Sequence, residues 1–141
     1  MQMFKQVGEF IPDSLIASNE FPILKEGIGL KAGQGVLKRG SLIMKGSDKA
    51  GYIAGTKATV TTGEGESAVT ADMEMKVFGI LTDDCDTGDD DTADNIPAVA
   101  YLTGQFNRDA VLVTGENTSV DDYEYEMRGV GMYLLSVQNY E

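Results

Sequence analysis

The fold class is indicated first by Gly27–Gly55, which reads GIGLKAGQGVLKRGSLIMKGSDKAGYIAG. Glycine interrupts this stretch every few residues, and the segments between the glycines are short and β-prone. Three of them have the length and composition of strands: Gly35–Leu37, Ser41–Lys45 and Tyr52–Ala54. Short β-prone segments separated by glycine are typical of strands that are joined by tight turns. The stretch therefore predicts a mainly β fold.

The residues that follow continue this pattern. Lys57–Thr62 and Ser67–Thr70 flank the segment Gly63–Glu66, which predicts a hairpin with an exposed, acidic tip. Gly104–Asn107 is predicted to form a turn or a bulge. The remaining strand candidates are Met75–Thr82, Ala98–Leu102, Ala110–Thr114 and Met132–Val137. Many short strands in a chain of 141 residues predict a single barrel-like or sandwich-like domain.

One short helix is predicted near the C-terminus. Ser119 is a good N-cap, and Asp122 three residues later completes a capping box. Arg128 lies where a positive charge favours the C-terminal end of a helix. Gly129 or Gly131 is expected to end the helix with a left-handed residue.

The first 25 residues do not have the pattern of a domain core, because their apolar residues follow neither a helical nor an alternating period. Prolines within the segment favour extended backbone before them. We therefore predict an extended arm over residues 1–25 and a β-rich domain over residues 26–141. An irregular segment packed on the protein's own core is an equally weighted alternative. The residues expected to dock on a partner are Phe4, Phe10, Ile11, Pro12, Leu15, Ile16, Phe21 and Pro22.

Charge is distributed unevenly along the chain. Residues 1–50 hold seven Lys or Arg and five Asp or Glu, a net of +2, whereas residues 51–141 hold four and eighteen, a net of −14. The sum is the net charge of −12. A surface this acidic repels phosphate backbones and anionic lipid headgroups. Neither nucleic acid nor a membrane is therefore an expected partner.

The composition argues against an enzyme. Histidine is absent, which removes the commonest general base and the commonest metal ligand. Cys85 is the one cysteine, so it cannot form an intramolecular disulfide and has no histidine to activate it. Residues 1–10 contain no apolar run of the signal-peptide type, and no stretch approaches the roughly 18 apolar residues of a membrane helix. We expect a soluble, non-catalytic protein that is made in a cytoplasm.

The acidic stretch Asp83–Asp94 is the strongest candidate for a binding site. Asp84 and Asp86 match the first two ligand positions of a calcium loop. Asp89 stands where such a loop needs glycine, and Asn95 stands where it needs glutamate. We therefore favour a solvated loop and expect no metal and no cofactor. A calcium-stabilised adhesion or carbohydrate-binding module is the alternative, and a hydrolase with two carboxylates is a distant third.

Four segments, in the same order, resemble parts of the phage lambda-like head decoration proteins. The most specific segment is Val99–Ala110, VAYLTGQFNRDA, where a strand ending in Thr-Gly precedes an aromatic residue and an Asn-Arg-Asp step. The other three segments are Val36–Ile43 (VLKRGSLI), Phe78–Asp84 (FGILTDD) and Arg128–Leu134 (RGVGMYL). Residues 1–20 match nothing in the family, and the hairpin within Thr56–Met75 looks like an enlargement.

The resemblance implies a β-clip (β-tulip) fold and no catalysis. It also implies a late viral protein that binds as a homotrimer at three-fold positions of the expanded head. The partner would be the phage major capsid protein, and the location would be the outer surface of the virion capsid in a bacteriophage. Such a capsid cement stabilises the assembled head against the internal pressure of its DNA. The arm would then be the segment that docks on the shell.

Overall fold

The computed structural model describes residues 15–18, 22–115 and 118–136, and it is mainly β, as the sequence predicts. Five strands close into a barrel in the order β10-β2-β5-β4-β8. The bounds of these strands are β2 Lys25–Leu30, β4 Leu42–Gly46, β5 Gly51–Ile53, β8 Met75–Leu81 and β10 Ile96–Tyr101. The barrel closes at a short contact, where Ala100 and Tyr101 pair with Leu81 and Ile80.

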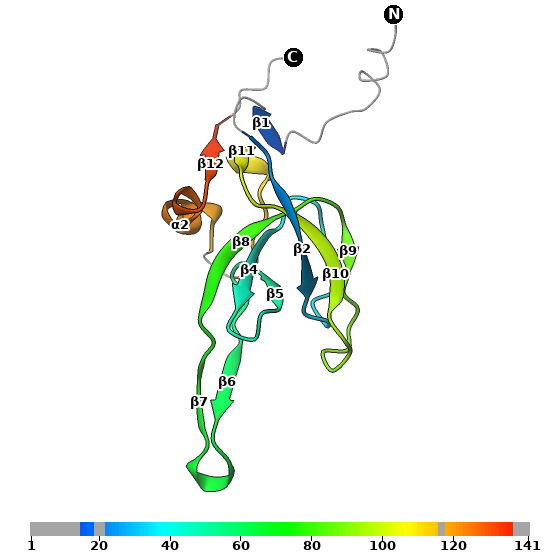
Figure 1. Ribbon diagram of the computed structural model, residues 1–141, viewed down its shortest axis with the longest axis vertical. Coiled ribbons are helices and arrows are strands. Elements are labelled where there is room, and N and C mark those ends of the chain that lie inside the picture. The colour runs from blue at the N-terminus through cyan, green and yellow to red at the C-terminus, as the bar shows by residue number, and fades with distance from the viewer. Residues whose placement is uncertain (1–14, 19–21, 116–117, 137–141) are drawn as a thin grey trace, which may run out of the picture.

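A second sheet lies at one end of the barrel, at the top of Figure 1. Its strands are β1 (Ile16–Ser18), β11 (Gly104–Asn107) and β12 (Met132–Leu135), with β11 in the middle. β11 runs antiparallel to β1 and parallel to β12. The short α-helix α2 (Glu124–Gly129) packs beside β12. The 3-10 turns η2 (Arg108–Ala110) and η3 (Val120–Tyr123) connect β11 to this helix.

Two further strand pairs lie outside the barrel and this sheet. β3 (Val36–Leu37) pairs with β9 (Cys85–Asp86). β6 (Thr59–Thr62) pairs with β7 (Val69–Asp72) in a hairpin whose turn contains η1 (Gly65–Ser67). This hairpin projects from the barrel at the opposite end from β1, β11 and β12 (Figure 1). The predicted hairpin is therefore confirmed, and it stands apart from the rest of the protein.

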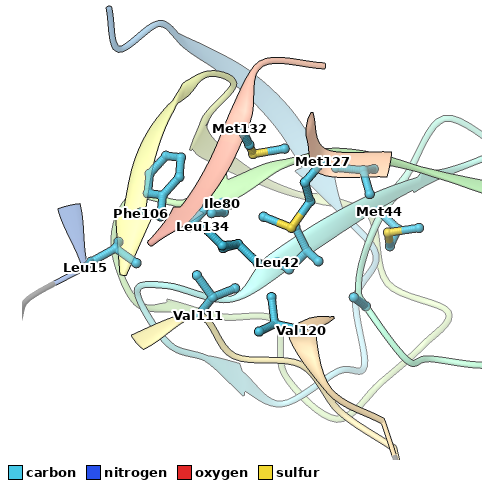
Figure 2. Packing of buried hydrophobic residues seen from close by; sticks show 12 residues of the cluster. Leu15, Leu42, Met44, Ile80, Phe106, Val111, Val120, Met127, Met132 and Leu134 are labelled. Atoms are coloured by element: carbon cyan, nitrogen blue, oxygen red, sulfur yellow. The ribbon is translucent and has the colours of Figure 1, made fainter. Parts of the chain in front are cut away.

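The core consists of two clusters that share strands β4 and β8. Successive residues of a strand point to opposite faces, so neighbouring apolar residues can serve two cores. Leu42 and Ile80 point into the larger cluster, whereas Ile43 and Leu81 point into the smaller one. Figure 2 shows the larger cluster, in which Leu42 and Ile80 lie among side chains of β11, α2 and β12. Its fully buried members from those elements include Phe106, Met127 and Met132.

Two predictions around the segment Val99–Ala110 are wrong, one for a turn and one for a strand. Gly104–Asn107 is not a turn but the central strand β11, because β1 and β12 supply hydrogen-bond partners on both sides. Ala110–Thr114 is not a strand; Leu112 makes only an isolated bridge to Ser41. The strand β2 was not predicted, because Gly27 and Gly29 hide its alternating pattern. β2 is stabilised by pairing along its whole length with β10.

The predicted helix start is confirmed in detail. The Ser119 hydroxyl accepts the Asp121 N–H, and the Asp122 carboxylate accepts the Ser119 N–H at 3.0 Å, which closes the capping box. The first turn is 3-10 in geometry and continues into α2. Gly131, with φ of +97°, is the left-handed residue after the helix, and Gly129 is not.

The prediction of an arm up to residue 25 is wrong for Leu15 and Ile16. Leu15 is only 1% exposed and reaches into the larger cluster (Figure 2). Its carbonyl oxygen accepts the Asn107 N–H at 2.7 Å, and Ile16 pairs with Phe106. These residues therefore follow the alternative interpretation, a segment packed on the protein's own core. Five of the predicted docking residues lie outside the described residues: Phe4, Phe10, Ile11, Pro12 and Phe21.

Candidate interaction surfaces

The predicted docking residues are not gathered into one patch by the structure. Leu15 is buried and Ile16 is half-buried in the β1–β11–β12 sheet, so neither side chain presents an open surface. Pro22 is exposed, and its carbonyl oxygen accepts a hydrogen bond from the Thr103 hydroxyl at 2.8 Å. The same hydroxyl accepts the N–H of Leu24, whose side chain is 56% exposed. Of the predicted docking residues that the structure describes, Pro22 is thus the exposed one, and the exposed Leu24 lies beside it.

Arg39 joins three parts of the barrel. Its guanidinium donates to the Thr82 carbonyl oxygen and to the Tyr101 hydroxyl, each at 2.9 Å. It also lies over the Tyr101 ring, 5.6 Å from the ring centre, in a cation–π contact. The backbone N–H of Arg39 donates to the Asp84 carboxylate at 2.8 Å. Arg39 therefore fixes the start of β4 against the end of β8 and the end of β10.

Arg108 links elements of the C-terminal part of the chain, as Arg39 links strands of the barrel. Its guanidinium binds the Glu124 carboxylate through two hydrogen bonds of 3.0 Å and also binds Asp121. Arg128 adds a second positive charge beside Glu124. The hydrogen bonds from Arg108 hold the pKa of the Glu124 carboxyl below its ordinary value. The sequence could not reveal this network, because the partners are 13 and 16 residues away from Arg108 and follow no local spacing rule.

The four segments that resemble decoration proteins lie next to one another. Ser41 and Leu81 are bonded through backbone, as are Val99 and Thr82. The Leu42 N–H donates to the carbonyl oxygen of Leu112, which lies just beyond the third segment in chain order, Val99–Ala110. β11, from the third segment, pairs with β12, from the fourth. The segments therefore form one connected body that comprises the β4–β8–β10 side of the barrel and the upper sheet.

The acidic loop is held against a glycine-containing loop and is not an open cage. Thr87 is buried, and it exchanges backbone hydrogen bonds with Gly33 and Gly35. Lys31 donates to the Asp91 carbonyl oxygen at 2.7 Å. A side chain at Gly33 would collide with Asp91, so glycine is needed there for the loops to approach. The loop's shape is thus explained by contacts within the chain.

The aspartates of this loop accept hydrogen bonds from their own chain. Asp86 accepts the Gly88 N–H, and Asp90 accepts both the N–H and the hydroxyl of Thr92. These bonds to Thr92 lower the pKa of Asp90. Within the described residues, no three Cys, Asp or Glu side chains are grouped so that they could hold a metal ion. The calcium-module alternative therefore gains no support from this geometry.

The β6–β7 hairpin projects from the barrel, and its second strand is fully exposed (Figure 1). Its two strands pair with each other and with no other described strand. All four residues of β7 are exposed, and the Val69 side chain is 62% exposed. The hydroxyls of Thr61 and Thr70 contact each other across the strands at 3.2 Å. We call the segment from Thr59 to Asp72 the ribbon.

In comparisons with known proteins, no protein-family model matches this chain, and no curated protein matches it in sequence. Among the described residues, no helix is long and apolar enough to cross a membrane.

A shallow hollow of about 230 Å³, between Thr82–Cys85 and Pro97–Val99, is open to solvent. The features that bear on function are thus the connected body, the segment around Pro22 and the ribbon.

Proposed function

We propose that this protein is a capsid decoration protein, a cement that binds the expanded head of a tailed bacteriophage from outside. In this proposal it acts as a homotrimer at three-fold positions, bound to the major capsid protein. It has no catalytic role and no cofactor. It stabilises the assembled shell against the pressure of the packaged DNA.

The observation that carries the proposal is the contact among the four resemblance segments. They are separated along the chain by 34, 14 and 17 residues, and the fold brings them into contact. Arg39 from the first segment bonds to Thr82 of the second and Tyr101 of the third. Gly131 of the fourth segment bonds through its carbonyl oxygen to the N–H of Gly104 in the third. A shared fold would produce such a connected set.

The two departures from the family pattern lie at the margins of the fold. The enlargement within Thr56–Met75 contains the ribbon, which projects from the barrel (Figure 1). The unmatched residues 1–20 include β1, which is an edge strand of the upper sheet beside β11. Both departures are therefore compatible with an unchanged central fold.

The burial of Leu15 narrows the proposed docking segment. Leu15 and Ile16 hold the chain to β11 and serve as its anchor. The proposed contacts with the major capsid protein then come from Phe4, Phe10, Ile11 and Pro12, and from Phe21 and Pro22 on the other side of β1. An anchor of this kind transmits force from the docked residues directly to the core.

Stabilisation of the shell follows from mass action. A ligand that binds only the expanded shell shifts the equilibrium toward that shell, by about 2.7 kcal/mol per site at a concentration of 100 Kd. A trimer presents three copies of each docking segment, so weak single contacts combine into tight binding. The net charge of −12 disfavours contact with packaged DNA, in agreement with a position on the outer surface.

The test is cosedimentation of the purified protein with expanded phage heads that lack decoration protein, including the cognate head, together with thermal rupture of those heads. We expect saturable binding and a higher rupture temperature. The variant Phe4→Ala with Phe10→Ala should reduce occupancy while its own unfolding temperature stays that of the wild type. Tyr125→Ala, which truncates a 91% exposed side chain on α2, is the matched control and should bind normally.

Two negative results have different meanings. If the wild-type protein binds no expanded shell, the cement function is wrong. If the wild type binds and the double variant binds equally well, the function stands and the docking segment is wrong.

A further inference from the structure

The barrel consists of two smaller sheets that meet along two short seams. In one sheet β4 pairs with both β5 and β8, and in the other β2 pairs with β10 along its whole length, from Lys25 to Leu30. The seam between β10 and β8 has two paired positions, and the seam between β2 and β5 has one, Leu30 with Gly51. We call the β2–β10 pair, together with residues 31–35 after β2 and 87–95 before β10, the flap.

The upper end of the flap is tied to the rest of the protein at several points. Arg39, which precedes β4, bonds to Thr82 and Tyr101 across the seam between β10 and β8. In the same seam the Thr82 N–H donates to the Val99 carbonyl oxygen at 3.1 Å. The Tyr101 ring lies 5.9 Å from the ring of Phe106, which is fully buried in the larger cluster. The upper end is therefore firmly attached.

The lower end of the flap, where β2 ends away from the upper sheet (Figure 1), is fastened to β5 by the side chain of Gln34. The amide nitrogen of Gln34 donates to the carbonyl oxygens of Lys31 at 2.8 Å and of Gly51 at 3.0 Å. The amide oxygen accepts the Ile53 N–H at 2.9 Å. The bonds to Gly51 and Ile53 cross the seam, beside the bond from the Lys31 N–H to the Gly51 carbonyl oxygen. Because a side-chain amide offers the donor and acceptor of a peptide group, Gln34 continues the strand pairing after β2 has ended.

The two core clusters are unequal, and the smaller one lies between the flap and the β5–β4–β8 sheet. Its buried residues include Ile28 and Leu30 from the flap and Ile43 and Leu81 from the facing sheet. The larger cluster has twelve buried members among the described residues, and none of them belongs to the flap. The cost of exposing apolar side chains grows with their area. Opening the flap therefore costs less free energy than unfolding the whole protein.

We propose that the flap opens as a unit about its upper end while the rest of the protein stays folded, and that Gln34 is the latch that keeps it closed. In the open form the bonds from the flap to β5 are broken. The pairing between β2 and β10 and the packing of the larger cluster stay intact. The smaller cluster is then exposed, so the latch sets how often this protein presents an apolar surface to other chains.

This inference does not depend on the capsid function, because the flap contains none of the residues proposed to dock on the shell. A failure of capsid binding would leave it intact, and its own failure would leave capsid binding intact.

The first experiment is native-state hydrogen exchange of the full chain, followed by NMR at urea concentrations below the unfolding transition. The N–H groups of Lys31 and Ile53 are bonded across the seam between β2 and β5 and report the opening. The Leu42 N–H, which donates to Leu112 beside the larger cluster, reports global unfolding. We expect the two seam amides to exchange at least about tenfold faster than Leu42, with a urea dependence that is weaker than that of Leu42 but not zero.

Two variants distinguish opening from global unfolding. Gln34→Ala removes bonds that are made only in the closed form, so exchange of both seam amides and of Leu42 should become about tenfold faster, equivalent to 1.4 kcal/mol. Val111→Ala is the matched control, because it truncates a buried side chain of the larger cluster that stays packed in the open form. It should speed exchange of Leu42 and leave the rates of Lys31 and Ile53 unchanged.

A conservative variant tests the hydrogen bonds of the latch. Gln34→Glu keeps the length of the side chain, but an ionised carboxylate cannot donate to the carbonyl oxygens of Lys31 and Gly51. At about pH 7 its seam amides should exchange as fast as those of Gln34→Ala. At about pH 4 the carboxyl is largely protonated and can donate again, so its seam amides should be several-fold better protected than those of Gln34→Ala at the same pH.

The opening is overturned if the seam amides of the wild type exchange at the rate of Leu42, or if Val111→Ala speeds both equally, because the seam then breaks only in global unfolding. Exchange of the seam amides without any urea dependence also overturns it, since that reports a local fluctuation and not an opening that exposes the smaller cluster. The role of Gln34 as the latch is wrong if Gln34→Ala leaves the seam rates unchanged, or if Gln34→Glu and Gln34→Ala are alike at both pH values.

Discussion

The barrel and the ribbon are both built mainly from antiparallel strand pairs, yet they are held together by different forces. In the barrel, strands distant in sequence pair and bury apolar side chains on both faces of β4 and β8. In the ribbon, neighbouring strands pair across a short turn, and β7 has no buried residue. The barrel is therefore stabilised mainly by burial. The ribbon depends on local pairing and β-propensity, because β6 and β7 pair with no other described strand.

The largest difference should appear when one side chain is truncated in the larger core cluster, which the barrel shares with the upper sheet, and one in the ribbon. Phe106→Ala removes a fully buried ring from the larger cluster and should lower the free energy of unfolding by about 3–5 kcal/mol. Val69→Ala removes two methyl groups from an exposed site of the ribbon and should change it by less than about 0.5 kcal/mol. Urea denaturation monitored by circular dichroism measures both. A comparable loss in the two variants would mean that the ribbon packs on the body.

Glycines with positive φ give a second comparison. Gly55 has φ of +99°, and a Cβ there would overlap the Thr114 carbonyl oxygen, so Gly55→Ala should cost about 2 kcal/mol or more. Gly65, at the tip of the ribbon, has φ of +59° and open space around it. Gly65→Ala strains the turn only locally and should leave the unfolding of the barrel unchanged. Thermal unfolding by calorimetry distinguishes the two, and equal shifts would show that ribbon and barrel unfold as one unit.

The smallest effect is a dependence on pH that only the body should show. The folded-state pKa of Glu124 lies below its ordinary value of about 4.5, because Arg108 binds the ionised form. Its contribution to stability is therefore present above the unfolded-state pKa and is lost as the pH falls through the folded-state pKa. Between about pH 5 and pH 3, Glu124→Gln should show a smaller fall in urea midpoint than the wild type.

The ribbon supplies the matched control for this change. Glu66→Gln makes the same replacement at the exposed tip and should keep the pH dependence of the wild type. If Glu124→Gln also keeps it, the bond between Arg108 and Glu124 contributes nothing measurable to folding.

Local features of the fold could be predicted from the sequence because their causes are local. The hairpin follows from two β-prone segments around Gly63 and Gly65, which adopt positive φ. The helix start follows from Ser119 and Asp122, which are three residues apart. The mainly β class follows from the glycine-punctuated stretch at Gly27–Gly55. In each case the residues that interact are close along the chain.

The features that could not be predicted depend on partners far away in sequence. Gly104–Asn107 has the composition of a turn, and it is a strand because β1 and β12 pair with it. Leu15 follows no apolar period, and it is buried because Phe106 and Leu42 form the cluster that receives it. The bond between Arg108 and Glu124 requires η2 to approach α2.

The sequence by itself thus determined the β class, the ribbon, the helix cap and the acidic character of this protein, since turn geometry, capping and charge act over a few residues. Tertiary structure decided which strands close the barrel, which apolar residues form the core and which charged side chains pair with each other. These outcomes depend on burial and on hydrogen bonds between distant segments, whose free energies appear only when the whole fold brings the partners together.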